Sequence, residues 1–385
     1  MAIITRRRTA AMLAASASTA AGFGLVGGGA HGAPDTIKFG VITPQTGPAA
    51  ESGRFQVNGA KLALDELNEQ GGPLGRRVEL VTEDSQGTNP GAVLAFSRLA
   101  GRGDIVAFLS GTPSTQTHAL APDALKAAKP VIMVFASDPN LTHMGHPWLF
   151  RCRPNDAYSA RVIATFGAQD LGKRRWAIVH STDAFGTAGM KALTEALGDL
   201  SPVLVQGYTN QQPDFVPVAL AVKRAGADVL ASYCTFDNDV ALLARHLREV
   251  GVGLPWIGSP TITGTTAMKL AGSALFGTYA VADFAADASP EAHAFAERYE
   301  QVHKVRPDFY AAAGFDSVRI LARAIDKAQS TESEAMRRAI LAIHGFKGAE
   351  GEYNFDVNGD GRHGYNVVKN DAGKLTFVRH VEFQD

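Results

Sequence analysis

Short apolar segments alternate with longer segments of helical periodicity along almost the whole chain. Short apolar runs between turn residues are typical of buried strands, whereas apolar positions three and four apart indicate amphipathic helices. The first half predicts strands at Ile37 to Thr43, Val78 to Glu83, Ile105 to Ser110 and Val131 to Phe135, and helices at Gly53 to Gln70, from Pro90 behind a capping Asn89, and at Thr115 to Ala128. Repeated strand–helix–strand units predict a mainly parallel, doubly wound sheet.

A second alternating series begins near Asn155. It predicts helices at Ala157 to Leu171, Ala184 to Leu197, Phe215 to Ala225 and Asp239 to Val250, between strands at Trp176 to His180, Val203 to Tyr208, Val229 to Tyr233 and Trp256 to Gly258. Three helical patterns follow, at Pro290 to Val305, Ala311 to Ala328 and Glu334 to Ile343, and then an alternating tail typical of a hairpin or three-stranded meander. No low-complexity linker separates the halves, which favours a chain that crosses between two α/β lobes several times.

Length and charge narrow the classes of function. A chain of 385 residues is long enough for two or three units that each bury a core. The formal net charge of -1 provides no field to attract nucleic acid or an acidic membrane surface. A nucleic-acid partner is therefore not expected.

The N-terminus differs in composition from the rest of the chain. Arg6 to Arg8 precede an uncharged stretch from Thr9 to Gly29, and small residues around Ala33 suit a cleavage site. This pattern predicts a secretory signal peptide at residues 1–33, and the adjacent arginines favour the twin-arginine route. The remainder is expected to be soluble in the periplasm, since no second apolar run of spanning length follows.

The chain has two cysteines, Cys152 and Cys234, and both lie in strand-like runs. Their spacing leaves a disulfide open in an oxidising compartment, but two buried free thiols are the expected case.

Several segments carry a likeness to a known family. They are Ile37 to Gly53 (IKFGVITPQTGPAAESG), Asn68 to Asp84 (NEQGGPLGRRVELVTED), the turn Ser114-Thr115-Gln116, Phe135 to Pro139 (FASDP), and Ala177 to His180 followed by Phe185-Gly186. In this order and spacing the chain resembles the periplasmic binding proteins of the leucine/isoleucine/valine type, which serve ABC importers. The likeness runs from about Ile37 to the C-terminus.

The resemblance implies a type I periplasmic binding fold. In this fold two doubly wound parallel-sheet α/β lobes are joined by a three-crossover hinge, with the ligand cleft between them. By that likeness lobe one spans residues 35–153 and 283–345, and lobe two spans residues 154–282 and 346–385. The position of the cleft agrees with the independent rule that open α/β sheets bind ligands at the carboxyl ends of their strands.

In lobe one the likeness implies ligand contacts in two loops, which hold Thr112, Ser114, Phe135, Ala136 and Ser137. Each loop ends a strand and opens a helix, so hydroxyls and free backbone N–H groups can converge there on a carboxylate or another acceptor. The alternative is that the serines only cap helices.

In lobe two the likeness implies contacts at Phe185, Phe236 and Ser259. Here the chain departs from the family, whose α-amino-acid binders carry tyrosines at the two phenylalanine positions and an acidic residue near Pro260. A buried ammonium without a carboxylate partner is costly. A ligand without an ammonium, such as an aromatic or aliphatic carboxylate or an amide, is therefore favoured. An amino acid remains open, with Asp156 or Asp237 as its acidic partner, and each phenylalanine has simple core packing as its alternative.

Asp156 and Tyr158 follow the first expected crossover. From the lobe junction both are expected to reach the ligand, although Asp156 suits the capping of a helix equally well.

Asp356 to Gly361 (DVNGDG) matches the opening of a calcium loop. Position twelve is Val367, which offers no oxygen where a bidentate glutamate is needed, so a turn between strands is preferred and no metal is expected.

The chain contains no Gly-x-Ser-x-Gly, phosphate-loop, His-Glu-x-x-His or Cys-x-x-Cys motif. We therefore expect a monomeric binding protein without cofactor or enzyme activity. Its predicted partners are a small-molecule ligand and the membrane permease of an ABC importer. The alternative function is a sensor that presents its ligand to a chemoreceptor or signalling partner.

Overall fold

The first sheet consists of parallel strands covered by helices on both faces. The computed structural model describes residues 36–383, so the predicted signal peptide lies outside the described residues. The strand order is β2-β1-β3-β4-β5, with β1 (Ile37–Thr43), β2 (Val78–Asp84), β3 (Ile105–Ser110), β4 (Val131–Met133) and β5 (Leu149–Arg151). All neighbouring strands run parallel. The doubly wound arrangement predicted for this half is confirmed.

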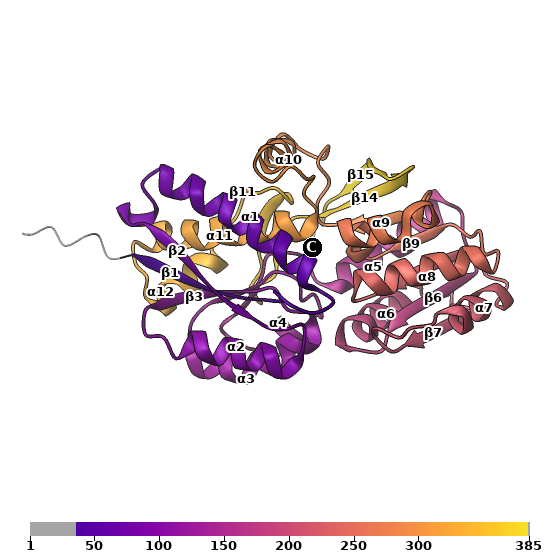
Figure 1. Cartoon of the computed structure of the whole chain (residues 1–385), viewed down its shortest axis with the longest axis horizontal. Helices are drawn as coiled ribbons and strands as arrows, with labels where there is room; N and C mark the ends of the chain where they lie inside the picture. Colours follow the sequence, from indigo (N-terminus) through magenta and orange to yellow (C-terminus); the bar gives the residue numbers. More distant parts are fainter. Residues whose placement is uncertain (1–35, 384–385) are drawn as a thin grey trace, which may run out of the picture. The chain divides into compact units, whose positions relative to one another are not determined.

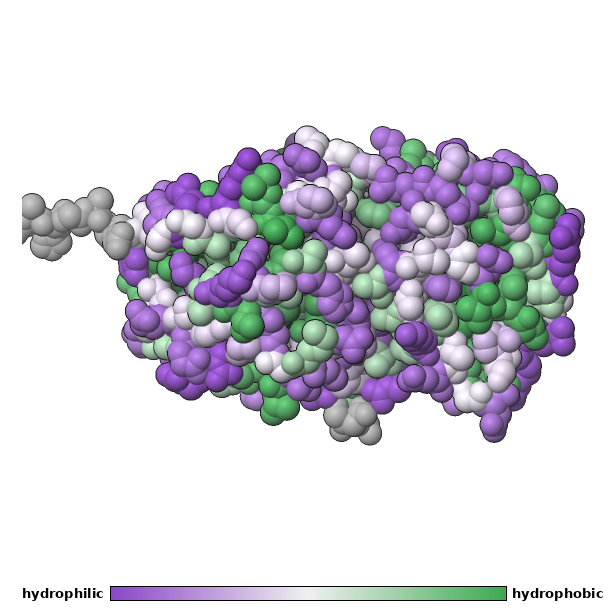
Figure 2. Space-filling model, turned by 90° about the horizontal axis from the view of Figure 1, so that it is seen from below, coloured by the Kyte–Doolittle hydropathy of each residue, from purple (hydrophilic) through white to green (hydrophobic). Residues whose placement is uncertain are grey.

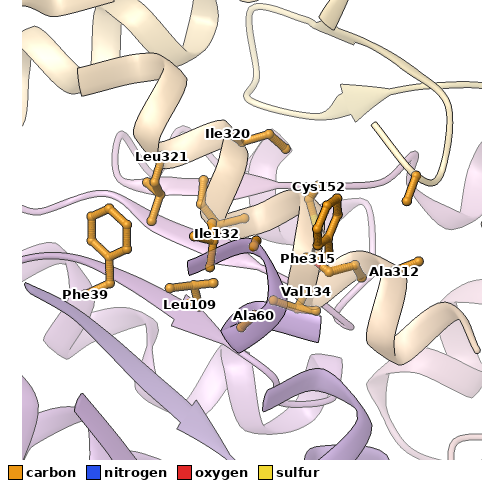
Figure 3. Packing of buried hydrophobic residues seen from close by; sticks show 14 of the residues in the cluster. Phe39, Ala60, Leu109, Ile132, Val134, Cys152, Ala312, Phe315, Ile320 and Leu321 are labelled. Carbon is orange, nitrogen blue, oxygen red and sulfur yellow. Dashed lines mark hydrogen bonds between the residues drawn. The ribbon is translucent and has the colours of Figure 1, made fainter. Parts of the chain in front are cut away.

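Side chains of successive strand residues enter two separate cores. Phe39, Val41 and Leu109 pack with α1 (Ala50–Glu69), α10 (Pro290–His303), α11 (Phe309–Ala328) and α12 (Ser333–Leu341). Ile42 and Phe108 face the opposite side, against α2 (Asn89–Ala100) and α3 (Ser114–Ala127). Figure 1 shows these two helical layers on either side of the strands, and Figure 3 shows the first core from close by. Burial on both faces explains why the strands are apolar throughout and do not alternate.

The second sheet has the order β15-β14-β10-β9-β8-β6-β7. Its strands are β6 (Trp176–Ser181), β7 (Leu204–Tyr208), β8 (Val229–Tyr233), β9 (Trp256–Gly258), β10 (Tyr279–Ala282), β14 (Tyr365–Asp371) and β15 (Lys374–Val381). The strands from β6 to β10 pair in parallel, whereas β14 runs antiparallel to β10 and β15 antiparallel to β14. Of the two arrangements expected for the tail, the structure shows the hairpin and not the three-stranded meander, and the hairpin extends this sheet.

Helices cover both faces of the second sheet as well. One core holds α5 (Asp156–Thr165) and α6 (Ala184–Leu197), and the other holds α7 (Val216–Arg224), α8 (Asp237–Glu249) and α9 (Thr265–Ala271). Further short elements are α4 (Asn140–His143), three 3₁₀ turns (Pro73–Gly75, Pro260–Thr263 and Gly272–Leu275) and a small sheet of β11 (Phe346–Lys347), β12 (Glu352–Phe355) and β13 (Gly361–Arg362). Tyr353 and Phe355 of β12 pack in the core of the first sheet.

The chain passes between the two sheets three times: from β5 to β6, from β10 to α10, and from β12 to β14. The predicted architecture of two doubly wound units with a three-crossover hinge is therefore confirmed. The exact residue boundaries of the two lobes remain a prediction.

A helix cap and a helix end are among the local features that differ from the sequence-based expectation. The cap of α2 is Thr88, whose side chain accepts a hydrogen bond from the Gly91 amide, where Asn89 was expected. The helix predicted from Ala157 to Leu171 changes to a π-helical turn at Phe166–Asp170. That turn holds Gly167, where a Cβ atom would lie 2.2 Å from the Trp176 ring, so the backbone approaches the indole more closely than a side chain would allow.

The surface is mixed in character. On the face drawn in Figure 2, hydrophobic residues are interspersed with hydrophilic ones. Within residues 36–383 no helix combines the length and the apolar character needed to cross a membrane.

Candidate ligand-binding site

A pocket that is partly open to solvent lies where the carboxyl ends of strands from both sheets face each other. From the first sheet it is lined by Pro44, Pro48, Ala49, Ser52, Gly111, Pro113, Ser114, Phe135, Arg153, Phe309 and Tyr310, and from the second by Phe185, Thr235, Phe236, Asp237, Pro260 and Thr261. We call it the inter-sheet pocket. Its place is the one that the strand-end rule predicts for a ligand.

The structure brings four of the residues predicted from the sequence into this lining: Ser114, Phe135, Phe185 and Phe236. Thr112, Ala136, Ser137, Asp156 and Ser259 are buried and do not line it. Tyr158 lies on α5, where its ring contacts Phe383 at 4.4 Å between centroids and its hydroxyl accepts from Arg362. The three predicted phenylalanines and Ser114 thus gather at the pocket, whereas Tyr158 and the other predicted residues lie outside its lining.

The buried hydroxyls form a hydrogen-bonded layer behind the pocket wall. Ser114 Oγ accepts from the backbone N–H groups of Ser137 and Asp138, each at 3.2 Å. Ser137 Oγ donates to Asp156 Oδ2 at 3.0 Å, and Thr112 Oγ1 lies 2.8 Å from Thr117 Oγ1. The N–H groups expected to face a ligand are therefore occupied by Ser114. The cap of α5 is Asn155, whose side chain accepts from the Ala157 amide, and not Asp156.

Asp237, the first residue of α8, is the acidic residue of the lining. It is buried, and its carboxylate accepts hydrogen bonds from Ser52 Oγ and Tyr310 OH, each at 3.2 Å. Burial, and then the nearby Asp308 carboxylate, raise the pKa of Asp237 to about 7. Sequence reasoning named Asp237 only as an alternative acidic partner for the ammonium of an amino acid.

Arg153 brings a buried positive charge to the pocket wall. Its Nη2 lies 2.7 Å from Asp283 Oδ2, and its Nη1 donates to the Phe135 carbonyl at 3.1 Å. Asp283 follows β10, and buried His363, which precedes β14, lies 3.8 Å from the same carboxylate. Side chains from all three crossing segments therefore meet at one buried ion pair.

Several buried acids bind their protons more tightly in the folded protein than in the unfolded chain. Burial is the largest cause of each shift. It raises the pKa of Asp156 and Asp237 to about 7, and that of Asp239, Asp283 and Asp308 to about 6. An acid with a raised folded pKa stabilises the fold at low pH, and this contribution is lost as the pH rises toward that pKa.

We therefore expect the protein without ligand to be more stable at pH 5.5 than at pH 8. Asp237 alone should contribute roughly 2 kcal/mol to the difference. Urea unfolding at the two pH values measures it, and Asp237→Asn should show a smaller difference. Equal stability at both pH values would contradict the expectation.

Hydrogen bonds join residues on the first sheet's side of the pocket to residues on the second sheet's side. Besides those of Asp237, the Ala184 amide at the start of α6 donates to Thr115 Oγ1 at 2.9 Å, and the Thr265 amide donates to Asp308 Oδ2 at 3.1 Å. Each satisfies a free N–H group in the first turn of a helix. These contacts hold the two sides of the pocket together.

Thr115→Val should weaken ligand binding by about 1 kcal/mol, or five- to tenfold in affinity, because the Ala184 amide loses the acceptor that joins the two sides of the pocket. Calorimetric titration with a bound small molecule measures the change. Thr182→Val is the matched control, since Thr182 Oγ1 donates to Tyr208 within the second sheet. An equal loss in both variants would show that the contact between Thr115 and Ala184 has no special role in ligand binding.

The cysteines and the predicted turn lie away from the pocket. Cys152 and Cys234 are free and buried in different cores, as expected. The turn between β12 and β13 is closed by Asp356 Oδ1, which accepts from the amides of Asn358 and Asp360. The Asp360 carboxylate accepts from Arg151 and Asn155, so protein donors occupy both of its oxygens.

Comparisons with known proteins agree with this geometry. The Leu/Ile/Val-binding protein BraC3 of Rhizobium johnstonii is 28% identical over 345 residues, which cover 88% of this chain and 93% of that protein. The branched-chain amino acid transporter substrate binding protein LivJ of Streptococcus pneumoniae, solved with isoleucine, has a TM-score of 0.83 at 22% identity, covering 90% of this chain and 100% of that one. The solute binding protein of an ABC transporter from R. palustris, solved with benzoate, has a TM-score of 0.82 at 18% identity, covering 91% and 98%.

A family model described as periplasmic binding protein matches residues 36–374, which is nearly the whole of the described chain. The fold is that of the type I periplasmic binding proteins, as the structural neighbours show. The chain therefore belongs to the periplasmic binding protein family.

Proposed function

We propose that this protein is the exported substrate-binding component of an ABC importer, which captures an amino acid or a related small organic carboxylate or amide. The observation that carries the proposal is a pocket lined from both sheets, whose two sides are joined by hydrogen bonds that Ser52 and Tyr310 donate and that Thr115 accepts. Relatives named for branched-chain amino acids, and a structural neighbour solved with benzoate, support a small organic ligand.

The walls suit a ligand with an apolar body. Phe135, Phe185, Phe236 and Phe309 line the pocket together with four prolines. Pockets that are mostly apolar, with few polar groups, are typical of sites for small organic molecules. We propose that Ser114 and the three phenylalanines predicted from the sequence contact the ligand directly. Thr112, Ala136, Ser137, Asp156 and Ser259 would support that wall from behind, and Tyr158 would act at the hinge.

The proposed mechanism is closure about the three crossing segments. Ligand first binds to one lobe, the second lobe closes over it, and the permease recognises the closed form. Closure is driven only by the ligand's higher affinity for the closed state. We place the third crossing after β12, because Tyr353 and Phe355 pack in the first core while β14 lies in the second sheet.

A thermal-shift screen of residues 34–385 tests the function. Amino acids, aromatic carboxylates, aliphatic diacids and amides are added separately, since a ligand that binds only the folded state raises its melting temperature. At least one compound class should raise it by several degrees. A panel without any such compound would contradict the proposed function.

A further inference from the structure

Two charged side chains line the inter-sheet pocket, Arg153 and Asp237. The guanidinium of Arg153 is already paired, with Nη2 2.7 Å from Asp283 and Nη1 donating to the Phe135 carbonyl. Arg153 and Asp283 together carry no net charge. Asp237 is therefore the group whose charge decides which ligands the pocket favours.

The partners of Asp237 within the protein are neutral. Ser52 and Tyr310 donate hydroxyl hydrogen bonds to it, and the charged neighbour that acts on it is another acid, Asp308. Hydroxyl donors alone compensate a buried carboxylate poorly, because taking a full charge out of water is costly without an opposite charge. A positively charged ligand group would supply the opposite charge that the Asp237 carboxylate lacks among these contacts.

Aromatic rings lie close to the Asp237 carboxylate. The Tyr310 ring, whose hydroxyl bonds Asp237, lies 4.7 Å from the Phe135 ring and 3.9 Å from the Phe309 ring, measured between centroids. Phe236 precedes Asp237 in the chain and also lines the pocket. Aromatic faces attract cations through their negative quadrupole and accept apolar groups equally well. A carboxylate among aromatic rings is an arrangement that suits an organic cation.

We infer that the ligand presents a protonated nitrogen to Asp237 and is an organic amine or amidine with an apolar or aromatic body. This inference rests on the proposed function and assigns its ligand to compounds that carry a protonated nitrogen, which include amino acids and exclude simple carboxylates and amides. The acidic residue that would pair with the ligand's nitrogen is Asp237, the first residue of α8. In the amino-acid-binding members that the chain resembles, the acidic residue lies near Pro260.

Ligand binding at Asp237 would also couple to closure. Asp237 belongs to the second sheet's side of the pocket, while its two hydroxyl donors belong to α1 and α11 on the first sheet's side. A cation bound to the carboxylate favours its ionised form, which accepts those two hydrogen bonds more strongly than the protonated form. The ligand would thus strengthen the contacts that hold the two sides together.

The test uses three probes of similar size, titrated calorimetrically into the protein at pH 7.5: phenethylamine, L-phenylalanine and 3-phenylpropanoate. At least one of the two amines should bind at least tenfold more tightly than the propanoate. Asp237→Asn, which keeps the shape of the side chain, should reduce amine affinity at least tenfold. Asp239→Asn is the matched control, with the same charge change on the same helix, because Asp239 accepts from the Gln211 amide and does not line the pocket.

A pH series distinguishes direct pairing from a change in shape. The titratable groups that face Asp237 are Asp308 and Tyr310. Amine affinity should rise between pH 5.5 and pH 8 in the wild type as Asp237 ionises, and should rise much less in Asp237→Asn.

Each outcome decides the inference. Propanoate binding that equals or exceeds amine binding, or amine binding unaffected by Asp237→Asn, would overturn it and leave the proposed function standing. If neither these probes nor any amino acid, carboxylate or amide bound, both would be overturned.

Discussion

Gly314→Ala is expected to lower the free energy of unfolding by about 3 kcal/mol or more. Helices α1 and α11 cross in close contact, and a Cβ atom at Gly314 would lie 2.2 Å from the Gln56 carbonyl oxygen. Gly59 faces the same crossing, with 1.9 Å to the Ala311 carbonyl oxygen. Because both obstacles are backbone atoms, relief requires the helices to move apart, which loosens the core in Figure 3.

Urea unfolding measures the loss, and Gly103→Ala is the control because its Cβ atom would meet open space. If Gly314→Ala and Gly103→Ala had similar stability, the helix crossing would be more compliant than the structure indicates.

Arg153→Met is expected to cost about 3 to 5 kcal/mol, because it leaves the buried carboxylate of Asp283 without its positive partner. Methionine retains the apolar stem of the arginine side chain, so the loss of stability measures the effect of removing the positive charge. Adding Asp283→Asn should recover part of the stability, since the unpaired charge is then removed.

Arg98→Met is the comparison, because Arg98 pairs with Glu83 at the exposed surface. Exposed pairs contribute about 0 to 1 kcal/mol, so this variant should unfold close to the wild type. Failure of Asp283→Asn to recover any stability would indicate that Arg153 acts through packing alone.

The architecture could be predicted from periodicity and resemblance because each buried strand and amphipathic helix has its own local pattern. Elements that lack such a pattern were missed: α9 and β10 span few residues, and β10 depends on pairing with β14 from far along the chain. Long-range pairing has no signal in a local window.

Within the candidate site, Phe135, Phe185 and Phe236 were predicted from the resemblance to the family, and all three line the pocket. Ser52 and Tyr310 were missed because each lies in the first turn of a helix, where polar residues are common. Nothing local to them indicates that both donate to Asp237, which lies far away in the sequence. Arg153 likewise has the sequence appearance of an ordinary strand end. Their roles depend on how the two sheets face each other.

The pairing of β10 with β14 has a consequence for the order of folding. Val367 and Val368 of β14 are fully buried in the cores of the second sheet, yet they follow the intervening helices α10 to α12 in the chain. That edge of the sheet therefore stays open until the last part of the polypeptide is available. Contacts of such large sequence separation slow folding, so a truncation before β14 should leave a partly folded, aggregation-prone intermediate.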